Sequence, residues 1–150
     1  MQSSSTTADI GSPPRLTYLI KRLEMAERAR MEEVLQPLGV TLHQYTALSV
    51  LERRGGLSSA QLARRNFVTP QASNQLVVLL ERQGLIERRA DTGNRRILRM
   101  WLTDDGERML SACHRAVDEI EARMLSVLTT VQAGEFRSAL ERTLAVLTES

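Results

Sequence analysis

The sequence has little of what disulfides, structural metal sites and membrane spans require. Its 150 residues include one cysteine and two histidines, so it can form no intrachain disulfide, and no metal or cofactor is expected. No apolar run approaches the roughly 20 residues that a membrane-spanning helix needs. The first residues also lack the apolar segment of a secretory signal. We therefore expect a cytoplasmic protein that does not associate with membranes.

Motifs that carry catalysis are also lacking. The pair Ser58-Ser59 has no histidine in a triad-like context and is better explained as a helix start. Gly55-Gly56 lacks the spacing of a phosphate-binding loop, and Asp104-Asp105 is typical of a helix N-terminus rather than of a metal site. We expect that the protein is not an enzyme.

Charge is distributed unevenly along the chain, although the net charge is only +2. Residues 61–103 contain eight basic and three acidic side chains, a net charge of +5. Residues 104–150 contain five basic and nine acidic side chains, a net charge of −4. A basic central segment followed by an acidic one predicts that one face of the protein meets a polyanion.

Apolar periodicity predicts a mostly helical chain. Residues 1–14 are rich in serine, threonine and proline and are expected to form a disordered tail. Apolar residues then recur at helical spacing from Arg15 to Leu38. Three shorter helices are predicted to begin after the capping residues Thr41, Ser58 and Thr69, the last of which precedes a proline.

Two more helices are predicted at the C-terminal end. The first begins at Asp104-Asp105 and extends for about 26 residues, with Cys113 on its apolar stripe. The second carries apolar residues between Phe136 and Leu147. A helix as long as the first indicates a partner along much of its length.

Between Gly84 and Asp104 the apolar period changes to two, which predicts a β-hairpin. Residues 85–89 and 95–102 would form its strands, joined by a turn at Asp91-Thr92-Gly93-Asn94. Arginines gather near this turn, and phosphate contact is favoured over simple solvation for Arg95, Arg96 and Arg99. Two short helices followed by a basic hairpin suit a protein that reads a DNA duplex.

The second of those short helices carries amide and hydroxyl side chains on the face that we expect to be exposed. Glutamine and asparagine can form bidentate hydrogen bonds with adenine, and serine tolerates several bases. The predicted DNA-binding residues are Gln71, Ser73, Asn74, Gln75, Arg88, Arg95 and Arg96. Alternatives remain open, since Ser73 lies near the apolar stripe and Arg88 has Glu87 and Asp91 as candidate ion-pair partners.

From about Arg15 to its end, the chain resembles the MarR family of bacterial winged-helix transcriptional regulators. In the hairpin, or wing, Arg96 and Leu102-Thr103 fit the family spacing, while Asn94 stands where the family has aspartate. The family also has a Leu-Ala pair in the third helix and Leu-Glu-x-x-Gly-Leu after the recognition helix. The matching residues here are Leu62-Ala63 and Leu80-Glu81-Arg82-Gln83-Gly84-Leu85, followed by Arg88.

The resemblance implies a winged helix-turn-helix at residues 41–103 and a homodimerisation region formed by long terminal helices at 15–40 and 104–150. The implied function is a sequence-specific transcriptional regulator, a ligand-responsive homodimeric repressor bound to a pseudo-palindromic operator in double-stranded DNA. The recognition helices would enter major grooves, and Arg96 would reach the minor groove. In the family the wing aspartate pairs with this arginine, and Asp91 is the candidate to replace it here.

The resemblance also implies an effector pocket between the helical region and the winged lobe. By location, Tyr18, Arg22, His43 and Tyr45 are candidates to bind a small aromatic or phenolic effector. Two alternative functions remain at this point. One is a redox-responsive regulator acting through Cys113, although a buried core residue is the simpler interpretation of this cysteine. The other is a winged-helix protein-interaction module that binds no DNA.

Overall fold

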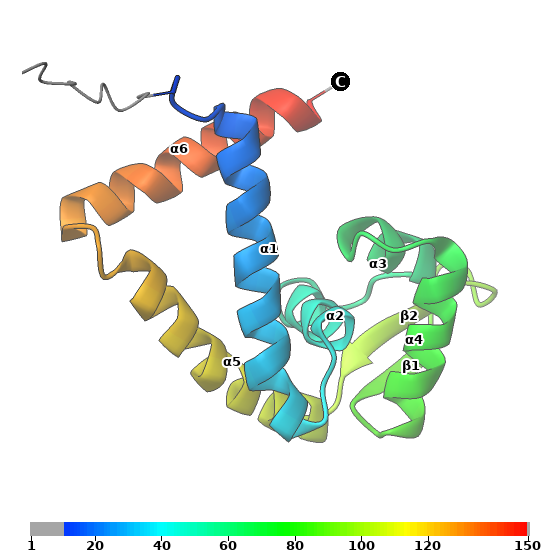
Figure 1. The fold of residues 1–150 in the computed structure, drawn as a ribbon. Coiled ribbons are helices and arrows are strands. Elements are labelled where there is room, and N and C mark those ends of the chain that lie inside the picture. The colour runs from blue at the N-terminus through cyan, green and yellow to red at the C-terminus, as the bar shows by residue number, and fades with distance from the viewer. Residues whose placement is uncertain (1–10, 150) are drawn as a thin grey trace, which may run out of the picture.

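The computed structural model describes residues 11–149, which form six α-helices, one short 3₁₀ helix and one two-stranded sheet (Figure 1). This confirms the expected mostly helical fold with a small β-wing. Of the predicted N-terminal tail, residues 1–10 lie outside the described residues, and residues 11–15 have no regular secondary structure. The elements are α1 (Leu16–Leu35), η1 (Gln36–Leu38), α2 (Leu42–Arg53), α3 (Ser59–Arg65), α4 (Pro70–Arg82), β1 (Ile86–Ala90), β2 (Leu98–Leu102), α5 (Asp104–Leu125) and α6 (Thr130–Thr148).

The helix starts lie where the capping residues predict them. Thr41 and Ser58 each form a capping box, because the hydroxyl accepts from the backbone of the third helical residue and that residue's glutamine side chain accepts in return. Thr69 caps α4 in front of Pro70, whose fixed φ suits the first helical position. Local sequence therefore determines the start of all three helices in the winged lobe.

Several boundaries differ from the sequence prediction, and β1 begins and ends one residue later than predicted. Helix α1 ends at Leu35, because Pro37 is accommodated in η1 and Gly39 ends that turn in the left-handed region with φ of 72°. Helix α5 ends at Leu125 after 22 residues. Strand β2 begins at Leu98 rather than at residue 95, since residues 91–97 form the closed turn described below.

Two apolar clusters hold the described residues together. The first lies inside the winged lobe, where α2, α3, α4, the sheet and the start of α5 meet around Leu48, Leu62, Leu80, Met100 and Leu110. The strands pair antiparallel, with Ile86 opposite Leu102. The second cluster joins the end of α1 to α5 and consists of Met31, Leu35, Val40, Cys113 and Val117. Helix α5 contributes to both clusters and so connects the lobe to the helical region.

Much of the helical region leaves its apolar side chains uncovered. Helix α6 has no buried residue, and in Figure 1 it lies at the end of α5 that is remote from the lobe. We use the name arm face for the exposed large apolar residues of α1 and α6 taken together, which are Leu16, Tyr18, Leu19, Ile20, Leu23 and Met25 with Val131, Leu140, Leu144, Val146 and Leu147. Even so, no helix between residues 11 and 149 combines the length and apolarity needed to cross a membrane.

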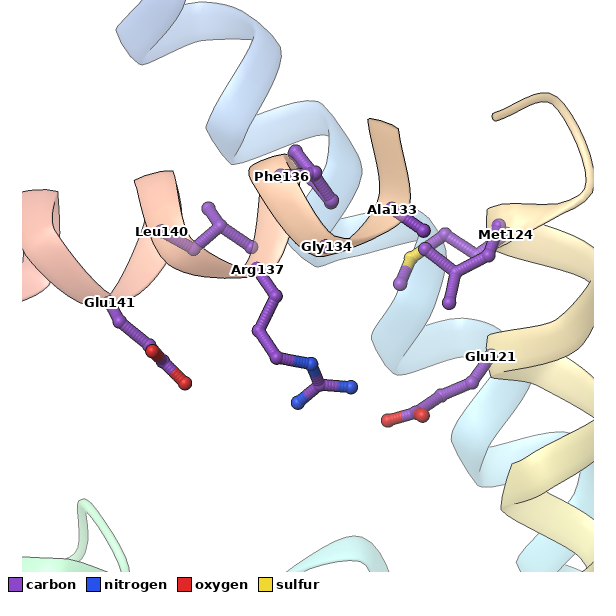
Figure 2. Close-up of a pocket in the computed structure, with 9 residues that line it drawn as sticks. Glu121, Met124, Ala133, Gly134, Phe136, Arg137, Leu140 and Glu141 are labelled. Carbon is purple, nitrogen blue, oxygen red and sulfur yellow. The ribbon is translucent and has the colours of Figure 1, made fainter. Parts of the chain in front are cut away.

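The corner between α5 and α6 encloses a cavity of about 360 Å³ (Figure 2). Met124, Phe136 and Leu140 give it apolar walls. Figure 2 shows the side chain of Arg137 between those of Glu121 and Glu141. The cavity continues the arm face, because Leu140 belongs to both.

Candidate nucleic-acid interface

Helix α4 presents polar side chains outward from its first two turns. Its amphipathic sequence buries Val77 and Leu80 against the lobe core. Gln71, Asn74 and Gln75 are exposed, as the sequence predicts for a face that reads base edges. No carboxylate lies on α4 before Glu81, so this face does not repel phosphate.

Ser73 does not belong to that face, and this part of the prediction is corrected. Its side chain is fully buried, and its Oγ donates a hydrogen bond of 3.2 Å to the carbonyl oxygen of Ser59. The reason is helical geometry, because Ser73 lies about 200° around the helix from Gln71. Ser73 therefore joins α4 to α3 and offers nothing to an external partner.

A groove between α3, α4 and the wing collects several of the predicted residues. Its volume is about 400 Å³, and it is lined by Ser59, Asn74, Val78, Arg88 and Arg96 among others. The recognition-helix amide and the wing arginine, which are 22 positions apart in the sequence, thus face one space. This juxtaposition is what the proposed reading of a duplex requires.

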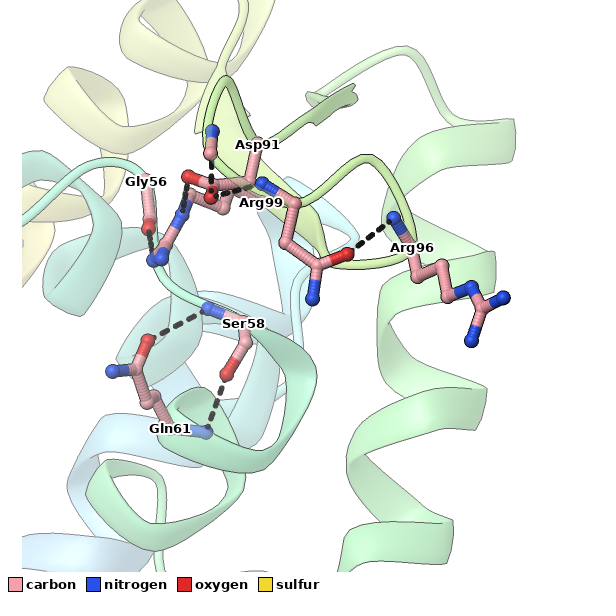
Figure 3. A network of polar contacts seen from close by, with 8 residues as sticks. Gly56, Ser58, Gln61, Asp91, Arg96 and Arg99 are labelled. Carbon is pink, nitrogen blue, oxygen red and sulfur yellow. Dashed lines mark hydrogen bonds and ion pairs between the residues drawn. The ribbon is translucent and has the colours of Figure 1, made fainter.

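The turn of the wing is closed by Asp91 (Figure 3). One carboxylate oxygen, Oδ2, accepts from the backbone N–H groups of Gly93 and Asn94, at 3.2 and 3.1 Å. The other, Oδ1, accepts from Arg99 Nε at 2.6 Å, and Arg99 Nη1 donates to the Gly56 carbonyl at 2.9 Å. The hydrogen bond from Arg99 is the main reason why the pKa of Asp91 lies below its ordinary value.

These contacts correct two predictions about the wing. Arg99 was expected to contact phosphate, but its guanidinium is committed to Asp91 and Gly56. Asp91 was the candidate partner of Arg96, but it pairs with Arg99 instead. Asn94 supports Arg96 only through the backbone, since its Oδ1 accepts from the Arg96 N–H at 3.1 Å.

Arg95 and Arg96 remain at the tip of this closed turn. Both side chains are exposed, and neither takes part in any ion pair among residues 11–149. In Figure 3 the Arg96 side chain extends away from the Asp91 network. The closed turn therefore presents two uncompensated guanidinium groups, whose planar sets of N–H donors can bind two phosphate oxygens at once.

Arg88 lies in the same groove but already has a partner. Its guanidinium forms a two-bond pair with Glu81 at the end of α4, one of the bonds being Nη2 to Oε1 at 2.9 Å. This hydrogen bonding raises the pKa of Arg88 and lowers that of Glu81. Both side chains are partly exposed, so the pair is accessible to solvent.

The base of the wing is held by Trp101. Its ring lies flat against the Gly55-Gly56 backbone, where a Cβ on either glycine would come within 2.7 Å of ring atoms. Gly56 also has φ of +76°, a conformation that glycine adopts at no steric cost. Arg89 lies over the ring at 5.5 Å from its centroid.

The four predicted effector residues fall into three places. Tyr18 and Arg22 stack on each other near the start of α1, with 5.9 Å between guanidinium and ring centroid. His43 lines a cavity of about 780 Å³ between the end of α1 and the start of α2, where Arg28 is also found. Tyr45 lines a separate cavity between α2 and α5. The structure does not bring the four together.

Tyr45 takes part in a short polar chain between α2 and α5. Its hydroxyl lies 2.9 Å from Nδ1 of His114, whose Nε2 lies 2.9 Å from Glu52. Burial is the main reason why the pKa of Tyr45 is raised. These hydrogen-bonded side chains connect α2 of the lobe to the long helix α5.

Cys113 is fully buried in the cluster between α1 and α5. Burial raises the pKa of its thiol. A redox sensor needs an accessible thiolate, so this environment fits the interpretation of Cys113 as a core residue.

Three contacts at the interface were not anticipated from the sequence. Ser59 donates from its Oγ to Asn74, Glu81 holds Arg88, and Trp101 packs on the glycine pair. The Glu81–Arg88 spacing of seven residues crosses from a helix to a strand, so no local periodicity reveals it. An adjacent glycine pair and a tryptophan in the second strand are the only sequence signals for the third contact.

Comparison with known proteins was made by sequence and by structure. The family model that matches is described as MarR family and covers residues 38–97. The chain is 38% identical over 127 residues to the HTH-type transcriptional repressor Rv2887 of Mycobacterium tuberculosis. The aligned region covers 85% of this chain and 91% of the relative. It is 34% identical over 99 residues to the HTH-type transcriptional repressor MdtR of Bacillus subtilis, and the aligned region covers 66% of this chain and 64% of that relative.

Solved structures extend this similarity to nearly the whole fold. The crystal structure of the M. tuberculosis MarR family protein Rv2887 in complex with DNA has a TM-score of 0.74 and 34% identity, covering 87% of this chain and 98% of that one. The complex of the same protein with p-aminosalicylic acid has a TM-score of 0.73 and 36% identity, covering 87% and 98%.

Proposed function

Because this chain belongs to the MarR family of transcriptional regulators, we propose that it is a ligand-responsive homodimeric repressor that binds a pseudo-palindromic operator in double-stranded DNA. Residues 41–103 would form the DNA-binding region, and residues 15–40 and 104–150 the dimerisation region. The protein would act in the cytoplasm and would catalyse no reaction.

The observation that carries the DNA-binding proposal is the pair of uncompensated arginines at the wing tip, next to a polar face of α4. Asn74 and Arg96 line one groove, so a single duplex would meet both. Gln71, Asn74 and Gln75 would contact base edges in the major groove. Arg95 and Arg96 would contact the backbone or the adjacent minor groove, and Arg88 would join them after releasing Glu81.

The homodimer is supported by the arm face. Eleven large apolar side chains of α1 and α6 are exposed in the single chain, which is more than a stable monomer ordinarily leaves in water. A second copy would cover the face, since a twofold axis pairs a surface with itself. The two recognition helices would then lie about 34 Å apart, the spacing of successive major grooves.

The effector proposal rests on the cavity between α1 and α2. Rv2887 has been crystallised with salicylic acid and with p-aminosalicylic acid, so we propose a small phenolic or aromatic acid for this chain. Arg28 lines the cavity and pairs with Glu24 at 2.8 Å. A ligand carboxylate would compete for this arginine, while His43 would border the ring. Tyr18, Arg22 and Tyr45 do not line this cavity.

A salt titration tests DNA binding. Affinity for short random duplexes should fall steeply between about 50 and 200 mM salt, because each phosphate contact releases counterions. Arg96→Ala should lower affinity at least about tenfold and reduce the log–log slope by about 2, as a dimer carries two wings. Arg108→Ala, an exposed position on α5, serves as the control. A flat salt dependence would contradict the proposal and favour a protein-interaction module.

Sodium salicylate tests the response to an effector. It should weaken binding to a selected duplex by roughly 5- to 150-fold, the usual range of allosteric coupling. His43→Ala should reduce this response, whereas Tyr18→Ala should retain it. Equal losses in the two variants would contradict the location of the site between α1 and α2.

A further inference from the structure

Two serines connect the start of α3 to the exposed face of α4. Ser73 is fully buried and donates to the carbonyl oxygen of Ser59. Ser59 in turn donates from its Oγ to Oδ1 of Asn74. Because Ser73 fixes the backbone of Ser59, the hydroxyl that reaches Asn74 projects from a defined position.

The contact uses one particular half of the Asn74 amide. An asparagine side chain has an oxygen that accepts hydrogen bonds and an NH₂ group that donates two. Oδ1 is turned toward α3 by Ser59, whereas Nδ2 takes part in no hydrogen bond within residues 11–149. Asn74 is exposed and lines the groove that contains Arg96. The amide therefore turns its acceptor to the protein and offers its donors to the groove.

This orientation determines which base edge the amide matches. A bidentate pair with adenine requires the amide oxygen to accept from N6 while the amide nitrogen donates to N7. The Ser59 bond occupies one of the two acceptor positions of Oδ1 and turns that oxygen toward α3, so a bidentate pair with adenine would have to use the remaining position. Its NH₂ group matches guanine, which has acceptors at O6 and N7, or thymine, which has one at O4. Adenine accepts only at N7 and places its N6 donor beside it, and cytosine presents only a donor.

We propose that Ser59 is a positioning residue that makes Asn74 select a keto base, guanine or thymine, instead of adenine. Ser59 acts through Asn74 and does not itself contact DNA. The inference rests on the proposed function, because it requires α4 to lie in a major groove. The proposal specifies which class of base Asn74 reads at one position in each half-site of the operator.

The test is selection from a pool of random duplexes by the full chain and by its Asn74→Ala, Ser59→Ala and Ser59→Thr variants. The position at which Asn74→Ala relaxes the preference is the position that Asn74 reads. The unaltered chain should favour guanine or thymine there by about fivefold or more, the lower end for a good base contact. Ser59→Ala frees Oδ1 and should raise the recovery of adenine by a similar factor.

Two variants separate positioning from a merely structural role. Ser59→Thr keeps a hydroxyl and should keep the preference for a keto base. Ser111→Ala removes an exposed hydroxyl from α5 and should select the same sequence as the unaltered chain. Sedimentation and thermal unfolding establish that every variant compared is a folded dimer.

Several results would overturn the inference. Adenine at the Asn74-dependent position of the unaltered chain would show a bidentate amide. An unchanged base after Ser59→Ala, or a Ser59→Thr protein that behaves like Ser59→Ala, would remove the role of the hydroxyl. So would selection of a defined sequence in which Asn74→Ala relaxes no position. If the unaltered chain selected no sequence and bound duplexes without salt dependence, the proposed function itself would fail instead.

Discussion

The winged lobe and the arm formed by α1 and α6 differ in what they leave exposed. The lobe buries most of its large apolar residues in one cluster, although Phe67 is 91% exposed, and it leaves uncompensated charge on its surface at Arg95 and Arg96. The arm does the opposite: α6 buries no residue, and Leu16 of α1 is 76% exposed. The lobe therefore has an apolar core and an exposed basic tip, whereas the arm leaves its apolar side chains uncovered within residues 11–149.

The difference explains how one chain can combine two kinds of recognition. Apolar burial stabilises roughly in proportion to area and persists at high salt, so it suits a permanent contact between two copies. Arginine–phosphate contacts weaken as salt rises, so they suit a reversible contact. Helix α5 contributes to both clusters and so connects the helical region to the lobe.

The largest effect is expected from a charge placed on the arm face. Leu144→Glu would place two carboxylates at the interface of two copies, where an unpaired buried charge costs about 3–5 kcal/mol. The protein should become monomeric and lose tight duplex binding, while the lobe stays folded. Sedimentation velocity measures the change, and Ser138→Glu, at an exposed polar position of α6, is the control. A Leu144→Glu protein that still sediments as a dimer would exclude α6 from the interface.

A substitution at the junction of the two regions should destabilise the whole chain. Gly106 lies in the first turn of α5, where an added Cβ would overlap the carbonyl oxygen of Leu85. Gly106→Ala should lower the free energy of unfolding by about 1–3 kcal/mol, as overpacking does. Thermal unfolding detects this, with Ser111→Ala as the comparison. An unchanged melting temperature would show that α5 can move without cost.

A smaller and local effect is expected in the wing. Asp91→Asn removes the charge that holds Arg99 and should lower duplex affinity severalfold, because the tip arginines lose their fixed position. Hydrogen exchange should accelerate at residues 93–99, with little change in overall unfolding. Equal exchange in the two proteins would contradict the role of Asp91.

The same carboxylate determines how the wing responds to pH. The pKa of Asp91 lies below its ordinary value of 3.8, so the contribution of the ion pair is fully present above pH 3.8. It is lost only as the pH falls through the lowered pKa. Hydrogen-exchange protection of the wing should therefore be independent of this group between about pH 5 and 8.

No effect is expected from oxidation of the thiol. Cys113 is fully buried and its pKa is raised by burial, so peroxide should leave duplex affinity unchanged. The unaltered chain and Cys113→Ala are compared after identical treatment. A loss of binding confined to the chain that retains Cys113 would restore the redox mechanism as the signal.

The order of elements and most boundaries could be predicted from the sequence, because capping residues act locally. Thr41, Ser58 and Thr69 each fix a helix start through contacts within three residues. Gly39 ends the first helical segment for a similarly local reason. Apolar spacing then indicated which faces are buried, and it placed Asn74 and Arg96 correctly on the surface.

Errors in the predicted site have a common physical cause. Ser73 and Arg99 are both engaged by groups distant in the sequence, at Ser59 and Gly56. Composition and spacing identify a polar or charged side chain but not whether the fold already supplies its partner. The predicted effector residues lie in three separate places. Residue spacing does not show how α1 and α2 pack against each other, and that packing forms the cavity between them.

The most direct test is a hydroxyl-radical footprint of the full chain on a selected duplex. The expected result is two protected minor-groove patches related by twofold symmetry, one for each wing, flanking major grooves about one helical turn apart. Arg96→Ala should lose both patches while the protein remains dimeric. A single patch, or a symmetrical footprint that persists in Arg96→Ala, would contradict the claim that two wing arginines position paired recognition helices on DNA.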